Sequence, residues 1–265
     1  VFVARDDYNG ADNEGIGIAQ QTIRDGRRES GVTAYLKPAL GRPNLRVETD
    51  AFVTGIVFDG TRAVGVSYEQ RGARRDVRAE REVILAGGVI NSPQLLMLSG
   101  IGPADRLRAF GIAVRADAPG VGENLQDHIS AGIFYKRKAP GPVHAEMRAD
   151  RAAINALRAY AFGTGPMSVF PNRYAAFIKS EPGLDIPDLQ LLFGGATLGA
   201  RPWFPGWRAP YEDAFGCRAP VLHPKTRGRI ELASADPKQP VKIRQNFFSD
   251  PYDMATLLRG LRIVR

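Results

Sequence analysis

The stretch AGGVINSPQLLMLSGIGP, residues 86–103, decides how the rest of the chain is interpreted. It follows a β-rich run, Glu82–Ala86, and brings together a pair of glycines, an Asn-Ser pair and Pro93. The glycines end a strand, Asn or Ser can cap a helix whose first turn takes the proline, and Gly100 follows the last turn. The pattern therefore predicts a strand, a glycine turn and the N-terminus of a helix.

The segment before this stretch predicts a β-hairpin. Two runs rich in β-branched and aromatic residues, Phe52–Phe58 and Ala63–Tyr68, flank the polar turn Asp-Gly-Thr-Arg at 59–62. Further upstream we expect a short helix from Ser30 that stops before Pro38, and a strand over Leu45–Thr49.

The segment after it predicts a short helix, a polar loop and then a second domain. The helix Ala104–Phe110 is closed by Gly111, and the loop VGENLQDH follows at 121–128. From about Ala131 the connections become rich in proline and glycine, which places a domain boundary there and divides the chain into residues 1–130 and 131–265. The elements expected in the second part are strands over 174–179, 189–193 and 230–233 and helices over Asp150–Phe162 and from Asp250 onward.

Both of these helices carry apolar side chains at helical spacing. The stripes consist of Ile154, Leu157 and Ala161 in the first helix and Met254, Leu257, Leu258 and Leu261 in the second. The second stripe is unfinished at Arg265 and the chain starts with Val1, so we expect the sequence to be a piece of a longer protein.

The composition is typical of a water-soluble globular protein, with 44% apolar and 24% charged residues in 265. No apolar run approaches the ~20 residues that a membrane span needs, and no targeting peptide is visible. The single cysteine, Cys217, excludes an internal disulfide, and three dispersed histidines make a metal site improbable. A reducing compartment, most simply the cytoplasm, fits this cysteine usage.

The net charge of +8 raises the question of nucleic-acid binding. The densest group of arginines surrounds a hairpin and has no interleaved aromatic residues that could stack on bases. It consists of Arg71, Arg74, Arg75, Arg78 and Arg81. We therefore interpret it as a solvated surface.

The stretch at 87–103 closely resembles the second sequence signature of the glucose-methanol-choline (GMC) oxidoreductases. The segments before it (DGRRESGVTAYLKPALGRPNLRVETDAFVTGIVFDGTRAVGV, 25–66) and after it (PGVGENLQDH, 119–128) are similar to the family's flanking segments. The run from Val221 to Arg265 is similar to the segment that precedes the family's catalytic histidine. One departure is Val89, where the family usually has a smaller residue.

The resemblance implies an α+β fold, with part of a Rossmann-like FAD-binding domain and a substrate domain whose antiparallel sheet is covered by helices. It implies oxidation of an alcohol, with hydride passing to FAD and the hydroxyl proton passing to a histidine. The resemblance implies that the family's GxGxxG loop, near the start, and its catalytic histidine, near the end, lie outside this sequence. The glycine pairs at 15–17 and 120–122 lack the third glycine of such a loop. No catalytic residue is therefore assigned within the chain.

The cofactor-binding residues expected from the resemblance surround the glycine turn and the hairpin. They are Val53, Ala86, Gly87, Gly88, Asn91 and Ser92. A helix N-terminus stabilises an anion, and glycines let a planar ring approach the backbone. In the family, the valine equivalent to Val53 contacts the adenine end of FAD through its backbone. On the residues alone, the turn is an ordinary strand-to-helix connection and Val53 a core residue.

Two further groups have open interpretations. Asn124, Asp127 and His128 could form an acid–base pair, but a loop held by side-chain hydrogen bonds is favoured, and His223 is also interpreted as structural. The aromatic residues of RPWFPGW, residues 201–207, could line a substrate entrance or fill a hydrophobic seam.

Three questions about the parent protein stay open at this level. The identity of the alcohol, the final electron acceptor and the oligomeric state have no signal in the sequence. Two alternatives to alcohol oxidation remain: a lyase of the same family that uses FAD structurally, and a non-catalytic basic binding module. As an isolated chain, we expect no turnover and weak or no FAD retention.

Overall fold

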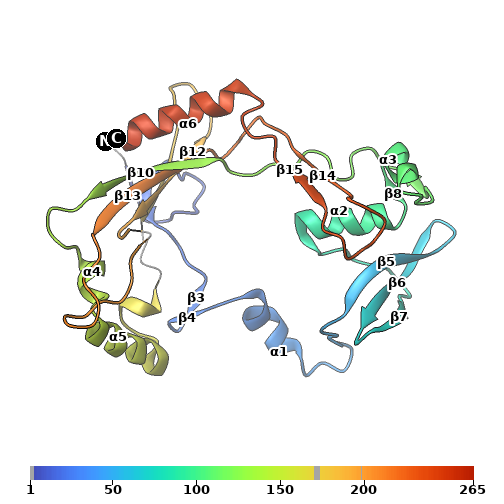
Figure 1. Cartoon of the computed structure of the whole chain (residues 1–265), viewed down its shortest axis with the longest axis horizontal. Coiled ribbons are helices and arrows are strands. Elements are labelled where there is room, and N and C mark those ends of the chain that lie inside the picture. The colour runs from blue at the N-terminus through green and yellow to red at the C-terminus, as the bar shows by residue number, and fades with distance from the viewer. Residues whose placement is uncertain (1–2, 170–173, 198) are drawn as a thin grey trace. The chain divides into compact units, whose positions relative to one another are not determined.

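The chain folds into two units, each assembled from segments that are distant in the sequence. The computed structural model describes residues 3–169, 174–197 and 199–265 (Figure 1). The first unit takes residues up to Leu45 together with His128–Pro224 and Pro251–Arg265, and the second takes Arg46–Asp127 and Lys225–Asp250. One break lies near the boundary expected at Ala131, and the chain crosses between the units at three further points. Which unit serves cofactor and which serves substrate stays a prediction.

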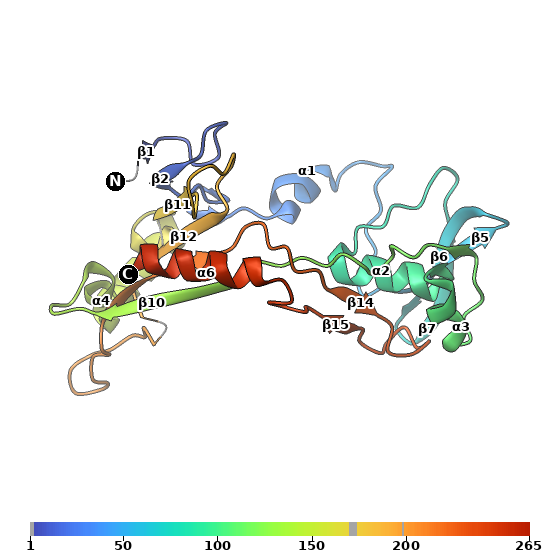
Figure 2. The same ribbon diagram turned by 90° about the horizontal axis from the view of Figure 1, so that it is seen from above.

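The first unit is built on a six-stranded sheet in the order β1-β2-β11-β12-β13-β10. Its neighbouring strands are antiparallel apart from the parallel pair β1 and β2. The strands are β1 (Ala4–Arg5), β2 (Gly15–Ile18), β10 (Ser130–Lys136), β11 (Tyr174–Ile178), β12 (Leu189–Gly194) and β13 (Ala214–Pro220). Helix α6 (Pro251–Val264) packs on β10, β12 and β13 and runs along the sheet (Figures 1 and 2).

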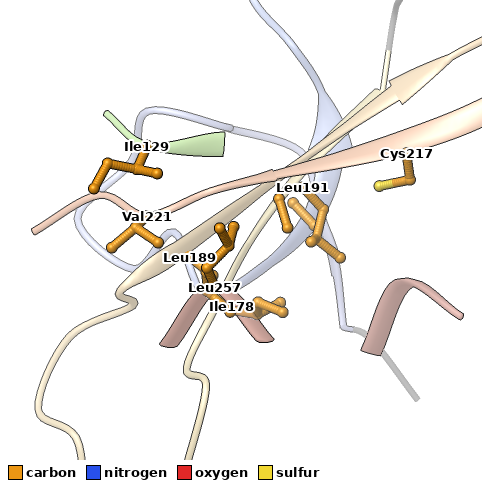
Figure 3. Packing of buried hydrophobic residues seen from close by; sticks show 9 residues of the cluster. Ile129, Ile178, Leu189, Leu191, Cys217, Val221 and Leu257 are labelled. Carbon is orange, nitrogen blue, oxygen red and sulfur yellow. The ribbon is translucent and has the colours of Figure 1, made fainter. Parts of the chain in front are cut away.

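The core of this unit lies between the sheet and α6 (Figure 3). Leu257 is buried from the helix side, while Leu189 and Leu191 are buried from β12. The same cluster contains Val221 and Cys217, so strand alternation places every second side chain of β12 and β13 toward the helix. Met254 and Leu258 of the expected stripe are 40% and 44% exposed, so only part of that stripe is covered.

Several short strands, turns and helices between the sheet strands complete the first unit. They are β3 (Ile23–Arg24), β4 (Arg27–Arg28), a π-helical turn η1 (Val32–Leu36), α1 (Lys37–Ala39), α4 (Pro142–Glu146), α5 (Ala149–Phe162) and the 3₁₀ turn η2 (Pro166–Ser168). The turn of the β3–β4 hairpin packs on the C-terminus of α5 through Gly26 and Gly163. A Cβ added at Gly26 would lie 1.9 Å from the carbonyl oxygen of Gly163.

The second unit combines a three-stranded antiparallel sheet with two helices and two small ladders. The sheet contains β5 (Phe52–Asp59), β6 (Arg62–Gln70) and β7 (Ala73–Arg78). The remaining elements are α2 (Gly88–Leu98), β8 (Ile101–Gly102), α3 (Ala104–Ala109), β9 (Ala116–Asp117), β14 (Arg229–Glu231) and β15 (Lys242–Arg244). Met97 of α2, Leu107 of α3 and Ile230 of β14 are each at most 2% exposed and form the centre of its core.

Several expected elements are confirmed, and the mixed α+β class is confirmed with them. The hairpin of β5 and β6, the helices α3, α5 and α6, and the strands β11, β12 and β14 all lie within a few residues of their expected positions. Helix α3 ends ahead of Gly111 at φ +70, and α2 ends ahead of Gly100 at φ +87. No helix in the described ranges has both the length and the apolar character of a membrane span.

Other expectations were wrong, each for a physical reason. The runs 45–49 and 82–86 form no ladder, because no strand among the described residues pairs with them through its backbone. Helix α2 begins at Gly88 instead of after Asn91 or Ser92, so Pro93 lies inside it. The helical segment near Ser30 continues to Ala39 through Pro38, which occupies the first turn of α1, where proline is tolerated.

Candidate cofactor cleft

The N-terminus of α2 leaves its first backbone N–H groups without a side-chain cap. Gly87 is the N-cap residue and offers no side chain, and no side-chain cap hydrogen bond is present. Gly88 follows at φ +79, a conformation that glycine adopts without strain. An uncapped N-terminus combines free N–H donors with a partial positive charge, so it can stabilise an anion or an electron-rich ring.

Helix α2 is held to its surroundings at its middle and at its C-terminus. At its C-terminus, the Ser99 hydroxyl donates to the Leu95 carbonyl at 2.6 Å and accepts from the Ile56 N–H of β5 at 2.9 Å. Near the middle of the helix, the Gln94 amide donates to the carbonyl of Gln239 at 3.1 Å, in the loop between β14 and β15. These bonds set the helix against the edge of the sheet, and a cleft opens between them.

The cleft has a volume of about 490 Å³ and walls that are mostly apolar. One wall is the start of β5, with Phe52 44% and Val53 37% exposed. A second wall is the run Val83–Ala86, and the third is one side of α2 from Asn91 to Leu98, with Gly87 at the start of the helix. Five of the six expected cofactor residues line it, namely Val53, Ala86, Gly87, Asn91 and Ser92.

The residues present fit a flat, partly anionic cofactor such as FAD. A Cβ added at Gly87 would lie 3.2 Å from Asn91 Cβ and 3.3 Å from Ser92 N, so a side chain here would crowd the first turn of α2 beside the cleft. A Cβ added at Gly88 would meet nothing within 4 Å, which shows open space beside the backbone. Apolar walls suit ring faces, and the hydroxyl and amide of Ser92 and Asn91 offer polar partners. That these residues contact the cofactor stays a prediction.

The cleft also contains residues that the sequence analysis did not select. Phe52, Val83 and Leu85 line it, and Gln94 lies at its edge. The sequence indicates only that Val83, Ile84 and Leu85 form an apolar run. The structure shows that all three line the cleft, with Val83 and Leu85 half-buried and Ile84 77% exposed. Gln94 has no local signal, since its role depends on a loop about 145 residues away.

The expected polar cluster is divided between the two units. Asn124 belongs to the second unit, adopts φ +62, and lines a separate polar cleft of about 520 Å³. His128 begins a segment of the first unit and is exposed, as is His223. The buried histidine is His144, whose ring lies 4.7 Å from that of Tyr211 and whose Nε2 is 3.2 Å from the Tyr211 carbonyl oxygen. Its surroundings are those of a packed core residue.

The aromatic loop at 201–207 fills a hydrophobic seam at Trp203, whereas a role at a substrate entrance stays a prediction. The Trp203 indole donates to the His144 carbonyl at 3.0 Å and its ring lies 5.1 Å from the imidazole, so it fills a seam. Trp207 is 63% exposed, with only Arg208 stacked on it. The arginines of β7, in turn, lie on an edge strand whose residues are all exposed.

Comparisons with known proteins agree with this fold. Residues 2–130 and 224–265 match the family models of the GMC oxidoreductases. An oxygen-dependent choline dehydrogenase from Brucella canis is 40% identical over 264 residues, which is 100% of this chain and 47% of that protein. Pyridoxine 4-oxidase from Mesorbium loti superposes with a TM-score of 0.80 at 24% identity, covering 100% of this chain and 47% of the other. A formate oxidase superposes with 0.82 at 22%, covering 99% and 49%.

The chain therefore spans about half the length of the curated relatives that it matches. The superpositions support the fold. Because the identity to these solved structures is below 25%, nothing about their individual reactions is carried over to this chain. The two segments that match the family models are far apart in the sequence and meet in the structure. In the second unit, residues 225–250 of the C-terminal match pack with residues 46–127 of the N-terminal match.

Proposed function

Since the chain belongs to the GMC oxidoreductase family, whose cofactor is FAD, we propose that it forms part of an enzyme that oxidises a CH–OH group. The FAD accepts the hydride when it is bound, and the protein supplies position and electrostatics. The observation that supports this most strongly is the apolar cleft at the uncapped N-terminus of α2, where five of the six residues implied by the resemblance meet.

The second unit's contribution is to hold one part of the cofactor. The edge of β5 presents Phe52 and Val53 to a ring face, and the backbone of Gly87 allows close approach. The N–H groups at the start of α2 favour negative charge on whatever group lies against them. A flavin gains negative charge when it is reduced, so such an environment favours the reduced form.

The chain does not supply the base in this proposal. A general base must reach the substrate hydroxyl, and its pKa must lie near the working pH. His144 is enclosed by Trp203 and Tyr211, while His128 and His223 are exposed. The GxGxxG loop and the base are accordingly assigned to sequence outside these 265 residues, in keeping with the half-length match to the relatives.

The cleft can be tested by filling it in the full-length flavoprotein. Val53→Trp places an indole inside the cleft, so FAD affinity should fall at least about ten-fold, which corresponds to ~1.4 kcal/mol. Val77→Trp, on β7 of the same sheet and 50% exposed, lies outside the cleft and should leave affinity within about two-fold. Titration of the apoprotein with FAD by flavin fluorescence measures both. Equal affinity in the two variants would remove this cleft from the cofactor site.

The reaction class has its own test. Anaerobic addition of alcohols to the FAD-loaded full-length protein should bleach the flavin absorption bands. A family member that uses FAD structurally, as a lyase, would keep its oxidised spectrum with every alcohol. Whether oxygen or a quinone then reoxidises the flavin separates an oxidase from a dehydrogenase.

A further inference from the structure

A groove of about 670 Å³ lies on the sheet of the first unit. Its floor exposes Leu192 of β12, beneath which lies the fully buried Ala175 of β11. One side is the β3–β4 hairpin, with Ile23 and Gly26, and the other side is the turn η2, with Met167. Leu192 is 37% and Met167 43% exposed, so the groove offers apolar surface to a ligand.

Strand register fixes which face of the sheet this groove occupies. Ala175 pairs with Leu192, and both line the groove. The next pair, Ala176 with Leu191, is buried in the core that contains Leu257 of α6. Because successive side chains of a strand point to opposite faces, the groove lies on the face that α6 does not cover. The helix covers one face. The other is covered at Phe177 by the stacked ring of Tyr8, 4.8 Å away, and is accessible at Leu192, which is 37% exposed.

The described lining of this groove carries positive charge and no negative charge. Among the described residues that line it, the one charged side chain is Arg28, and no carboxylate is present. The polar remainder consists of neutral amides and hydroxyls, such as Gln20, Thr22 and Ser168. The neighbouring carboxylate of Asp7 accepts a hydrogen bond from Gln20 Nε2 at 2.8 Å and lies outside the lining. Asp25 is exposed in the hairpin turn and also does not line the groove.

A quaternary ammonium group needs a different environment. It is recognised by several aromatic faces, commonly together with a carboxylate. Tyr174 is the one aromatic side chain among the described lining residues, and it is 56% exposed. A guanidinium in the same groove repels a cation. The matched relatives named as choline dehydrogenases act on a trimethylammonium alcohol, so the groove departs from what such a substrate requires.

We propose that this groove receives an uncharged alcohol with an apolar body, and that trimethylammonium alcohols are poor substrates. The inference rests on the proposed function and narrows it to a substrate class. The exposed side chains of Leu192 and Met167 pack against the apolar body, while the amides and hydroxyls of the rim serve its polar groups.

The first test compares two alcohols on the full-length FAD-loaded protein. Anaerobic stopped-flow measures the rate constant of flavin reduction and the dissociation constant of each alcohol. The ratio of the rate constant to the dissociation constant should be at least ten-fold larger for benzyl alcohol than for choline. A value for choline equal to or above that for benzyl alcohol would overturn the substrate class while leaving alcohol oxidation intact. Failure of every alcohol to reduce the flavin would instead overturn the proposed function, and this inference with it.

The second test places a carboxylate in the groove. Arg28→Glu should tighten choline binding, measured by the perturbation of the flavin spectrum, and should raise the choline-to-benzyl-alcohol ratio at least ten-fold. Arg27→Glu is the control on the same strand, because Arg27 is also exposed on β4 and lies outside the groove. Since its guanidinium donates to the Tyr160 carbonyl of α5 at 3.2 Å, thermal unfolding checks that this variant is folded. It should leave the ratio within two-fold. Equal ratios in the two variants would show that the substrate does not lie beside Arg28.

Discussion

The carboxylate of Asp188 is one of the buried charges that hold the first unit together. It is 4% exposed and accepts hydrogen bonds from the Ser180 N–H and the Ser180 hydroxyl, both at 2.7 Å. The Tyr252 hydroxyl of α6 approaches it at 3.4 Å. The carboxylate therefore joins the β11–β12 connection to the start of α6, and its removal leaves donors unsatisfied.

Substituting this residue should lower the stability of the first unit. Asp188→Asn is expected to reduce the free energy of unfolding by about 1–3 kcal/mol, because an amide cannot accept all three bonds in this geometry. Asp185→Asn, in the same connection but exposed, should change it by less than ~0.5 kcal/mol. Urea unfolding followed by circular dichroism gives both values. Equal stabilities for the two variants would contradict the role given to Asp188.

Cys217 gives a second prediction for a single residue. Burial raises the pKa of its thiol from the usual 9.0 to about 11. Because the thiolate is the reactive form, alkylation by iodoacetamide at pH 8 should be at least about 100-fold slower in the folded chain than in urea. The unfolded thiol ionises first, so the folded state should lose stability as pH rises above 9. Alkylation at equal rates in both states would contradict the burial of this side chain.

At the scale of elements, the β3–β4 hairpin depends on a backbone contact between two glycines. Gly26 has φ +70, and an added Cβ would lie 1.9 Å from the Gly163 carbonyl oxygen. Gly26→Ala should therefore lower the free energy of unfolding by about 2 kcal/mol or more, through both backbone strain and the clash. Gly60→Ala is the matched control, with φ +59 and nothing within 4 Å of the added Cβ. It should cost only about 1 kcal/mol, from the strain of positive φ. Thermal unfolding compares the two, and equal losses would contradict the hairpin–helix contact.

The elements that the sequence predicted well are those with local signals. The turn Asp59–Arg62 joins two β-rich runs, and Gly111 ends α3 as expected. The strands β10 and β13 were missed, because their residues lack clear alternation and their pairing joins positions 130–136 to 214–220. The stripe of Ile154 and Leu157 on α5 is 60% and 65% exposed, although its periodicity indicates burial. Periodicity shows that a face is apolar and does not show what covers it.

Among the residues of the two candidate sites, some could be predicted from the sequence and others could not. The resemblance supplied Val53, Asn91 and Ser92, and the structure brings them to one cleft. The groove beside Arg28 had no sequence signal, because its lining comes from three separate parts of the chain, among them Ile23, Met167 and Leu192, which meet only in the folded unit. Residues that act through long-range packing are the ones that a single sequence leaves unmarked.

The surface of the whole chain is larger than a self-contained fold of this size would expose. The accessible area is 17410 Å² for 28.9 kDa. A compact monomer of this mass exposes about 11,400 Å², and two separate compact bodies of half the mass about 13,700 Å² together. Ile84 and Val89, 77% and 66% exposed beside the cofactor cleft, belong to this excess. We infer that such apolar faces are covered in the working protein.

This surface leads to the prediction that belongs to the whole molecule. Without a cover over the cleft, the walls of Phe52, Val53 and Leu85 hold a cofactor from one side only, so affinity for FAD should be low. The isolated 265-residue chain should therefore show weak or no FAD retention after gel filtration, and no turnover of any alcohol.

The most direct test of the account is the visible absorption spectrum of this chain after refolding with FAD, measured beside that of the full-length protein. We expect flavin bands in the full-length protein alone, and we expect an uncharged alcohol such as benzyl alcohol to bleach them under anaerobic conditions. A full-length protein without flavin, or one whose bands no alcohol bleaches, would contradict the assignment to alcohol oxidation. An isolated chain that holds FAD and bleaches would contradict the claim that the base and the phosphate loop lie outside it.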